Sequence, residues 1–331
     1  MALGSTQPTA IANKLVDIVI LDDEQPTYDK GDKKPQFTSI SYFPDGKQIV
    51  GGSTYNSARR WDLQTGEEIK DAQVVCEREV WAVAVSSDSR WVIVGGGDRD
   101  RNDVGELKAC EVETGMMKTF KGHSKIVSCI DVSVDNRLLA SGSFDHMARI
   151  WDLSLNTGKL VAGPFECAGI VGAVRFSQDS KKLAIKSSVH GRCLEWGNTV
   201  AVSTLLVDSP VFCTTNDRSI VAAFRFEDDS EDPTKIYEFD SSLIRETVGA
   251  PFEHAQTITG LALSFDCALL ASASFYYNTI KLWAFKSRQL LASFDIHNPC
   301  TLILSPNSLQ LAYTSFSTRD PHMRHSIQHH C

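Results

Sequence analysis

The sequence has 331 residues, of which 42% are hydrophobic and 22% are charged, and its formal net charge is −8. These proportions are ordinary for a soluble globular protein and are sufficient to bury a core. The negative charge argues against nucleic acid or an anionic membrane as a partner, because both are bound mainly through clustered Lys and Arg.

Nine cysteines are scattered along the chain without a C-x-x-C pair. Free cysteine behaves as a small buried hydrophobe, so we expect a reducing compartment and no disulfides. The N-terminal segment lacks the pattern of a signal peptide, and its apolar run "LVDIVIL" is interrupted by Asp17 and is too short to span a bilayer. We therefore expect a soluble cytoplasmic protein, with the nucleus as the alternative location.

The first predicted strand, "KLVDIVILDD", occupies residues 14–23 and has no neighbouring strand in sequence. The polar, Pro-containing residues 23–36 follow it and are typical of a linker. We interpret residues 1–36 as an N-terminal strand plus linker, and we expect residues 14–22 to complete a sheet formed by the other end of the chain.

A unit of two strands joined by a polar turn recurs from residue 37 onward. The turns are centred on Asp45, Asp88, Asp135, Asp179, Asp217, Asp266 and Asn307, at a spacing of about 38 to 49 residues. An alternating strand such as "WAVAVSS" precedes each turn, and a more continuously apolar strand such as "WVIVGG" follows it. Asp, Asn, Ser and Gly stabilise such reversals, so the pattern predicts repeated antiparallel pairs.

A third strand follows in most units and ends in a large residue. That residue is Trp61, Trp151, Trp196, Tyr237 or Trp283, with Cys110 in the corresponding place of the second unit. A less regular fourth strand completes each unit. Four-stranded units at this period predict an all-β fold, a β-propeller whose sheets follow one another around a ring.

The segment "GHSKIVSCIDVSVDNRLLASGSFDHMARIWDL", residues 122–153, resembles a complete WD repeat. The resemblance extends over about residues 38–315. The chain is similar to the multi-copy WD-repeat proteins of mushroom-forming fungi. It implies a structural hydrogen-bond network of His123, Ser143 (with Ser141 as the alternative), Asp145 and Trp151. The sixth unit retains His254, Ser274 and Trp283 for the same role. Units with Cys110-Glu111 or Tyr237-Glu238 instead of Trp-Asp are expected to depend more on packing.

We accordingly predict a seven-bladed β-propeller of four-stranded antiparallel blades over residues 37–317, with the last blade incomplete or closed by the N-terminal strand. Residues 318–331 are rich in His, and only "HSIQHHC" could pair as a strand, poorly. We expect this segment to be a disordered tail rather than a metal site, because a terminus offers its histidines no scaffold.

Two other motifs are candidate sites of chemistry. "GGGDRDRNDVG", residues 95–105, lacks the G-x-x-x-x-G-K-[ST] pattern and opens no helix, so we interpret it as a loop between strands. "EDDSED", residues 227–232, lacks the spacing of a calcium loop. No G-x-S-x-G or H-E-x-x-H motif is present, and we expect neither an enzyme nor a cofactor.

Aromatic residues recur in the loops between second and third strands, which a propeller brings to one face. The predicted partner-binding face contains Trp81, Phe144, Tyr55, Phe275, Tyr276, Tyr277, Lys125 and Arg99. Aromatic residues and arginine dominate the energetics of protein interfaces. The sequence therefore predicts a non-catalytic scaffold for protein or peptide partners, with no nucleic acid, membrane or small-molecule substrate. The alternatives are a sensing module that works with a separate nucleotide-binding or signalling partner and, less favoured, a propeller enzyme.

Overall fold

The computed structural model describes residues 21–22, 37–69, 74–98, 105–154, 158–187, 195–196, 199–203, 211–214, 218–224, 235–241, 247–253, 258–275, 277–315 and 326–330. This part of the chain consists of strands, turns and loops and contains no α-helix. Within it there is accordingly no helix with the length and hydropathy needed to cross a membrane.

The described strands form seven sheets, six of four strands and one of three, which we number in chain order. Sheet 1 contains β2 (Phe37–Tyr42), β3 (Gln48–Ser53), β4 (Ser57–Asp62) and β5 (Val74–Val75). Sheet 2 contains β6 (Val80–Val85), β7 (Trp91–Gly96), β8 (Glu106–Glu111) and β9 (Met117–Thr119). Sheet 3 contains β10 (Val127–Val132), β11 (Leu138–Ser143), β12 (Met147–Asp152) and β13 (Leu160–Glu166).

The second half of the chain continues the series. Sheet 4 contains β14 (Val171–Phe176), β15 (Leu183–Ser187), β16 (Glu195–Trp196) and β17 (Thr199–Ser203). Sheet 5 contains β18 (Val211–Cys213), β19 (Ser219–Phe224) and β20 (Lys235–Asp240). Sheet 6 contains β21 (Gly260–Leu263), β22 (Leu269–Ser274), β23 (Thr279–Ala284) and β24 (Gln289–Asp295). Sheet 7 contains β25 (Pro299–Leu304), β26 (Leu311–Ser315), β27 (Ser326–His330) and β1 (Leu21–Asp22).

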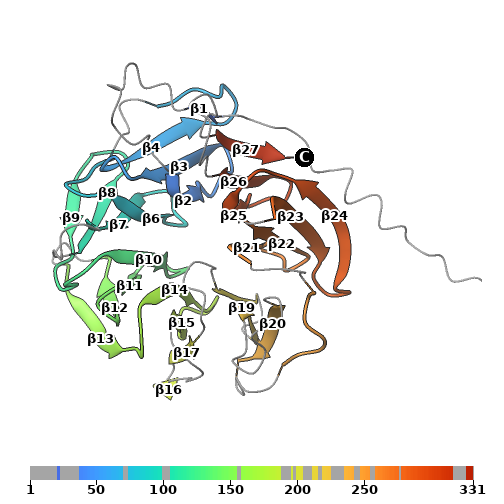
Figure 1. Ribbon diagram of the computed structural model, residues 1–331. Helices are drawn as coiled ribbons and strands as arrows, with labels where there is room; N and C mark the ends of the chain where they lie inside the picture. Colours follow the sequence, from blue (N-terminus) through green and yellow to red (C-terminus); the bar gives the residue numbers. More distant parts are fainter. Residues whose placement is uncertain are drawn as a thin grey trace, which may run out of the picture.

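The sheets are arranged around a common centre, with β2, β6, β10, β14, β21 and β25 nearest to it (Figure 1). Each sheet shares a hydrophobic cluster with the next sheet along the chain. Sheet 7 packs on sheet 1, where Ala312 joins the cluster around Ile49 and Trp61. The Thr301 hydroxyl also donates a hydrogen bond to the carbonyl of Thr38, at 3.1 Å. The arrangement is therefore an all-β propeller.

The recurring polar turn forms as the sequence predicts. In sheet 3 the Ser133 hydroxyl donates to the Asp135 carboxylate at 2.6 Å, and the same serine oxygen accepts from the amide of Leu138 at 2.9 Å. Equivalent Ser-x-Asp or Ser-x-Asn bonds occur in the first turns of sheets 2, 4, 6 and 7. These bonds satisfy the polar groups of the reversal locally, which lets the flanking strands be buried.

Close packing between neighbouring sheets requires a small residue near the end of the second strand in sheets 1, 2 and 3. An added Cβ at Gly142 would lie 2.3 Å from a Val171 methyl carbon of the next sheet. Gly52 and Gly95 occupy the same place in sheets 1 and 2 and would meet Val80 and Val127 in the same way.

Sheet 4 departs from the predicted strand order. The repeat pattern predicts that residues 193–198 lie beside the second strand, but β17 pairs with β15 instead, in parallel, and β16 with Trp196 forms the edge. The segment "TVAVS" of β17 is uncharged and β-branched, whereas β16 contains Glu195. The β-branched residues of this segment favour a strand, and the pairing of β17 with β15 shows that the predicted order was wrong here.

Both ends of the described chain meet in sheet 7. Leu21 and Asp22 pair with Ile327 and Ser326, so the part of the 14–22 prediction that lies within the described residues is confirmed. Residues 326–330, which we assigned to a disordered tail, instead pair with β26 as β27. That assignment was wrong for this strand, because β26 offers a free edge whose backbone groups β27 satisfies.

A polar network fixes the loop between β11 and β12. The two ring nitrogens of His123 lie 2.9 Å from the Asp145 carboxylate and 2.8 Å from the Ser141 hydroxyl. The indole N–H of Trp151 donates to the same serine oxygen at 2.8 Å, and the guanidinium of Arg149 donates to Asp145 at 3.1 Å. The network therefore joins β11, β12, the loop between them and the segment that leads into β10.

Of the two serines that the resemblance offered for this network, the structure uses the alternative one. Ser141, not Ser143, joins the histidine to the tryptophan; the Ser143 hydroxyl donates instead to the carbonyl of Lys125, at 3.0 Å. In sheet 6 the Trp283 indole likewise donates to Ser272, at 3.0 Å, and not to Ser274. Residues two apart on a strand share a face, so strand periodicity alone could not separate the two serines.

Sheets without the Trp-Asp pair have polar contacts of their own. Glu111 accepts from Arg90 at 2.6 Å and also from Thr114. Glu238 accepts from Ser219 at 2.5 Å and from Arg288 at 2.9 Å. We expected these sheets to depend more on packing, but they also contain polar pairs that take the place of the Trp-Asp contacts.

Burial lowers the pKa of His123, although its hydrogen bond to Asp145 opposes this effect. Burial would raise the pKa of Asp145, but the bonds from His123 and the Ser124 amide, together with the charge of Arg149, hold that pKa well below its usual range. We interpret the network as a neutral imidazole beside a carboxylate that remains ionised.

We predict that His123→Asn flattens the pH dependence of stability on the acidic side of neutrality. The pKa of His123 is about 6.5 when unfolded and lower when folded, so the unfolded chain binds more protons below that pH and the free energy of unfolding falls. The Asp145 contribution is lost only at more acidic pH, because its folded pKa is depressed. Thermal unfolding from about pH 7 to about pH 5 measures the effect; equal slopes in both proteins would contradict it.

We also predict that Ser141→Ala destabilises the protein more than Ser272→Ala. Loss of the Ser141 hydroxyl leaves two buried groups, on His123 and Trp151, without a partner, at a cost of about 2–3 kcal/mol. Loss of the Ser272 hydroxyl removes the partner of the Trp283 indole, at about 1–2 kcal/mol. Urea unfolding of the two variants makes the comparison, and an equal or reversed order would refute the ranking.

Candidate functional site

The loops that join second to third strands lie at the same end of the ring as the segments that lead into the first strands. We call this end the loop face; its described tight-loop residues are 54–56, 144–146, 275 and 277–278. Each loop ends on a residue with positive φ, namely Asn56, His146 or Asn278. The carbonyl of each of these residues accepts from the amide that follows the fourth strand, at 2.7 to 2.8 Å. The sheets therefore hold these loops in place through backbone bonds.

Trp81 occupies a special position in the innermost strand of sheet 2. The register between β6 and β7 shifts between Val80 and Ala82, which makes Trp81 the extra residue of a β-bulge. In sheets 1 and 3 the equivalent residues are Thr38 and Ser128, whose hydroxyls donate to a carbonyl of the next sheet. Bulges redirect a side chain, and here a large indole replaces the hydroxyl at the mouth of the central channel.

Trp81 contacts Phe144, which is the first residue of the loop after β11. Their ring centroids lie 6.0 Å apart with an interplanar angle of 57°. Both side chains are half-buried, so the pair keeps part of its apolar surface accessible. Two predicted site residues, one from sheet 2 and one from sheet 3, are thereby brought together across a sheet boundary.

The other predicted aromatic residues extend along the same face. Tyr55 and Tyr277 are 41% and 53% exposed on the loops of sheets 1 and 6, and Phe275 is half-buried. Lys125 is exposed on the segment leading into β10. Its carbonyl accepts a hydrogen bond from the Ser143 hydroxyl, so Lys125 lies beside the loop that begins with Phe144. Tyr276, Arg99 and His254 lie outside the described residues.

A carboxylate that the sequence analysis missed positions the segment leading into β6. Glu106 accepts from the amides of Glu77 and Arg78 at 3.2 and 3.1 Å and pairs with Lys108. Burial would lower the pKa of Lys108, but its hydrogen bond with Glu106 and the charge of that residue raise it overall. Burial also raises the pKa of the neighbouring Cys76 thiol to about 12, so this cysteine is unreactive. Nothing in the repeat pattern marks Glu106 for this role.

An ion pair links three innermost strands farther from the loop face. The buried Asp131 of β10 accepts from the Arg175 guanidinium at 3.1 Å and from the amide of Phe176 at 2.7 Å. Arg175 also lies over the ring of Phe212 in β18, 5.4 Å from its centroid. Burial raises the pKa of Asp131, and the charge of Arg175 opposes this effect. The contacts tie sheets 3, 4 and 5 together.

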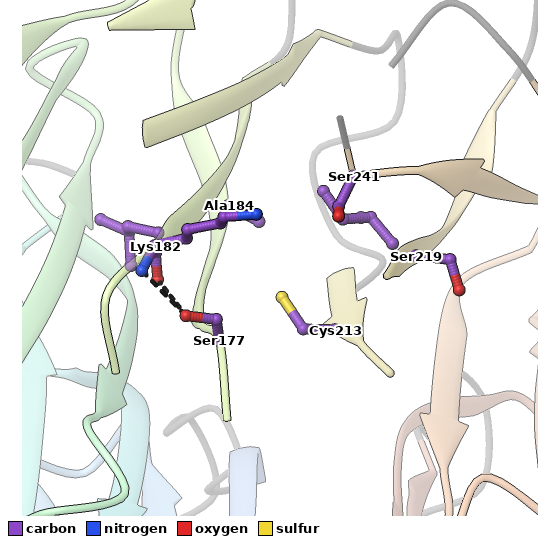
Figure 2. A pocket seen from close by; sticks show the side chains of 8 residues that line it. Ser177, Lys182, Ala184, Cys213, Ser219 and Ser241 are labelled. Carbon is purple, nitrogen blue, oxygen red and sulfur yellow. Dashed lines mark hydrogen bonds between the residues drawn. The ribbon is translucent and has the colours of Figure 1, made fainter. Parts of the chain in front are cut away.

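A small cavity lies between sheets 4 and 5 at the end of the ring opposite the loop face (Figure 2). Ser177, Lys182, Cys213, Ser219 and Ser241 are among its lining residues. Its volume of about 10 Å³ is enough for about one water molecule. Ser177 is already bonded to the backbone of Lys182, so the cavity offers a ligand little beyond a packing gap.

The described residues bring together no group of three or more His, Cys, Asp or Glu side chains suited to a metal ion. His123 and Asp145, whose pKa values are both lowered, form a pair that is enclosed by Ser141, Arg149 and the amide of Ser124. The arrangement of this pair is that of a structural network, and the loop face presents aromatic surface with mixed charge.

Comparison with known families identifies the repeat. The model of the WD domain, G-beta repeat, matches residues 73–100, 115–152 and 246–284. These segments include most of sheets 2, 3 and 6.

Curated relatives match part of the chain. Residue identity is 28% over 121 residues with Groucho of Drosophila melanogaster and 27% over 116 residues with a guanine nucleotide-binding protein subunit beta of Arabidopsis thaliana. These alignments cover 35% and 34% of this chain and 15% and 31% of the relatives. A WD repeat-containing protein of Schistosoma mansoni, SL1-17, is 28% identical over 48% of this chain and 51% of its own length. The chain thus matches about half or less of each of these relatives.

A solved structure of U3-55K matches the fold over nearly the whole chain. The TM-score is 0.67, with 15% identity, and the match covers 95% of this chain and 98% of that one. At this identity the match supports the ring of sheets alone. The repeat matches and the Trp-Asp network of sheet 3 show that the chain contains WD repeats, and the structural match shows that its fold is a β-propeller.

Proposed function

We propose that the protein is a non-catalytic scaffold that binds a protein or peptide partner on its loop face. The observation that carries the proposal is the Trp81–Phe144 pair, with its centroids 6.0 Å apart and both rings half-buried across a sheet boundary. Aromatic side chains supply most of the energy of many interfaces and lose little conformational entropy on binding. A pair fixed by two sheets is therefore ready to receive an apolar side chain.

The frame around this pair supports rigid display. We propose that the seven sheets are the seven blades of one propeller over residues 37–317, with residues 1–36 and 318–331 supplying the closing strands of the last blade. Each loop is attached to its blade by backbone bonds, so binding requires little ordering of the scaffold. Tyr55, Phe275, Tyr276 and Tyr277 widen the contact area, and Lys125 and Arg99 provide polar contacts at its rim.

The relatives support a role in protein assembly. A WD-repeat match to the beta subunit of guanine nucleotide-binding proteins from several plants favours a second candidate, a recognition module that works with a separate nucleotide-binding partner. Both candidates use the same face and differ in the partner.

We propose no catalytic role, cofactor, small-molecule substrate, nucleic acid or membrane partner for this surface. Catalysis requires converging titratable groups open to substrate, and the His123–Asp145 pair is enclosed in its blade. A cytoplasmic location remains our prediction from composition.

We predict that Trp81→Ala combined with Phe144→Ala removes the partners that the native protein captures. The double variant deletes the aromatic pair and leaves the network of Ser141 and Trp151 intact, so folding is retained. Affinity capture with both proteins, followed by mass spectrometry, measures the loss. The matched control is Phe265→Ala, because Phe265 is 68% exposed in the turn after β21, at the opposite end of the ring.

The control variant should capture the same partners as the native protein. Retention of the same partners by a folded double variant would refute the assignment of the face. Recovery of a nucleotide-binding protein only with an intact aromatic pair would favour the second candidate.

A further inference from the structure

The segment that leads into β10 is fastened to the loop that begins with Phe144. The Ser143 hydroxyl donates to the carbonyl of Lys125 at 3.0 Å. The amide of Phe144 donates to the carbonyl of the next residue, Ile126, at 2.9 Å. These two bonds fix the backbone at Lys125 beside the loop that supplies one ring of the Trp81–Phe144 pair.

The positive charge of Lys125 is not compensated by the protein itself. Its side chain is exposed, and among the described residues it makes neither an ion pair nor a hydrogen bond. The adjoining loop contains the carboxylate of Asp145, but that group is already engaged inside its sheet. It accepts from the Ser124 amide at 3.0 Å and from Arg149 at 3.1 Å, and it lies 2.9 Å from a ring nitrogen of His123. The ammonium of Lys125 is therefore available to a carboxylate from outside the chain.

Other cations of sheets 2 and 3 are differently placed. Lys108 pairs with Glu106, and Arg149 belongs to the enclosed network. Lys121 is also exposed, but it lies at the outer end of the segment, directly after the outer strand β9. Lys125 lies at the inner end of the same segment, two residues before the innermost strand β10, which places its charge next to the aromatic pair.

One extended peptide can contact both the aromatic pair and Lys125. Side chains two positions apart in an extended chain point to the same side and lie about 7 Å apart. The long alkyl stem of a lysine lets its ammonium cover such a distance while the stem packs on apolar surface. The apolar contact supplies most of the affinity, and the charged contact at its edge selects among peptides.

We propose that Lys125 pairs with an Asp or Glu side chain of the partner, within two positions of the apolar residue that contacts Trp81 and Phe144. This assignment rests on the proposed function and names the chemistry of the partner at the same site. The partner segment combines a large apolar side chain with a neighbouring carboxylate. A segment with Lys or Arg in place of that carboxylate is rejected, because it brings like charges together.

Selection from a library of random peptides displayed on phage, with the full-length protein immobilised, tests the proposal. We expect the enriched peptides to carry a large apolar residue with Asp or Glu within two positions. Lys125→Glu should replace this preference by one for Lys or Arg, and should weaken binding of an enriched acidic peptide about three- to tenfold. The matched control is Lys47→Glu, which makes the same change at an exposed lysine of the first turn of sheet 1, at the opposite end of the ring. It should leave the preference unchanged.

A charge exchange isolates the ion pair from other effects of the substitution. An enriched peptide whose acidic residue is changed to Lys should bind the Lys125→Glu variant more tightly than it binds the native protein, because both members of the pair are then reversed. Thermal unfolding verifies that the variants are folded, as the exposed side chain of Lys125 leads us to expect.

The possible outcomes distinguish this proposal from the proposed function. Trp81→Ala combined with Phe144→Ala should abolish the enrichment of apolar peptides. If it does, but the native protein shows no acidic preference or Lys125→Glu leaves that preference intact, the role of Lys125 is overturned and the loop face is retained. If the double variant enriches the same peptides, or the native protein enriches none, both proposals are overturned.

Discussion

The structure depends on the packing of each sheet against the next. Second strands such as β7 and β22 are buried along their whole length, because each is covered on one face by the preceding sheet and on the other by the following one. Burial of a large apolar side chain contributes about 1.5–3 kcal/mol, and no single sheet could bury both of its faces alone. Sheet 7 must therefore meet sheet 1, which it does through Ala312 and Thr301. The closed ring is what makes the loops of the face rigid.

The polar groups of each repeat are secondary to this packing, and they are replaceable. In sheet 3, the ring of His123 and the carboxylate of Asp145 form a hydrogen bond with each other. In sheets 2 and 5, Glu111 and Glu238 take different partners, arginine and a hydroxyl, at positions where the tryptophan is absent. A buried carboxylate must be paired, but the chain can pair it in several ways once the apolar core has set the strand positions. This freedom explains how the repeats diverge in sequence while the ring is retained.

The spacing of the repeats and the residue types of their turns were sufficient to predict the strands and turns. Alternation of apolar residues every two positions and Ser-x-Asp reversals are both local signals. They also placed Trp81 and Phe144 on the same face. They could not predict the ring contact between these residues, since it depends on a bulge at Trp81 and on the neighbouring sheet. The choice between Ser141 and Ser143, two residues apart on one strand, is likewise a tertiary outcome.

The departures from the repeat are where this molecule acquires individual surfaces. A hydroxyl that would bond the next sheet is replaced by the indole of Trp81, which exposes apolar area at the channel mouth. The outer strand of sheet 6 has seven residues and a single charge, at Asp295, whereas the outer strand of sheet 3, of equal length, contains proline. Neither change disturbs the packing between sheets, because Trp81 lies at the loop-face end of an innermost strand and β24 lies at the outer edge of its sheet. A ring held by its core thus tolerates variation where the core is not affected.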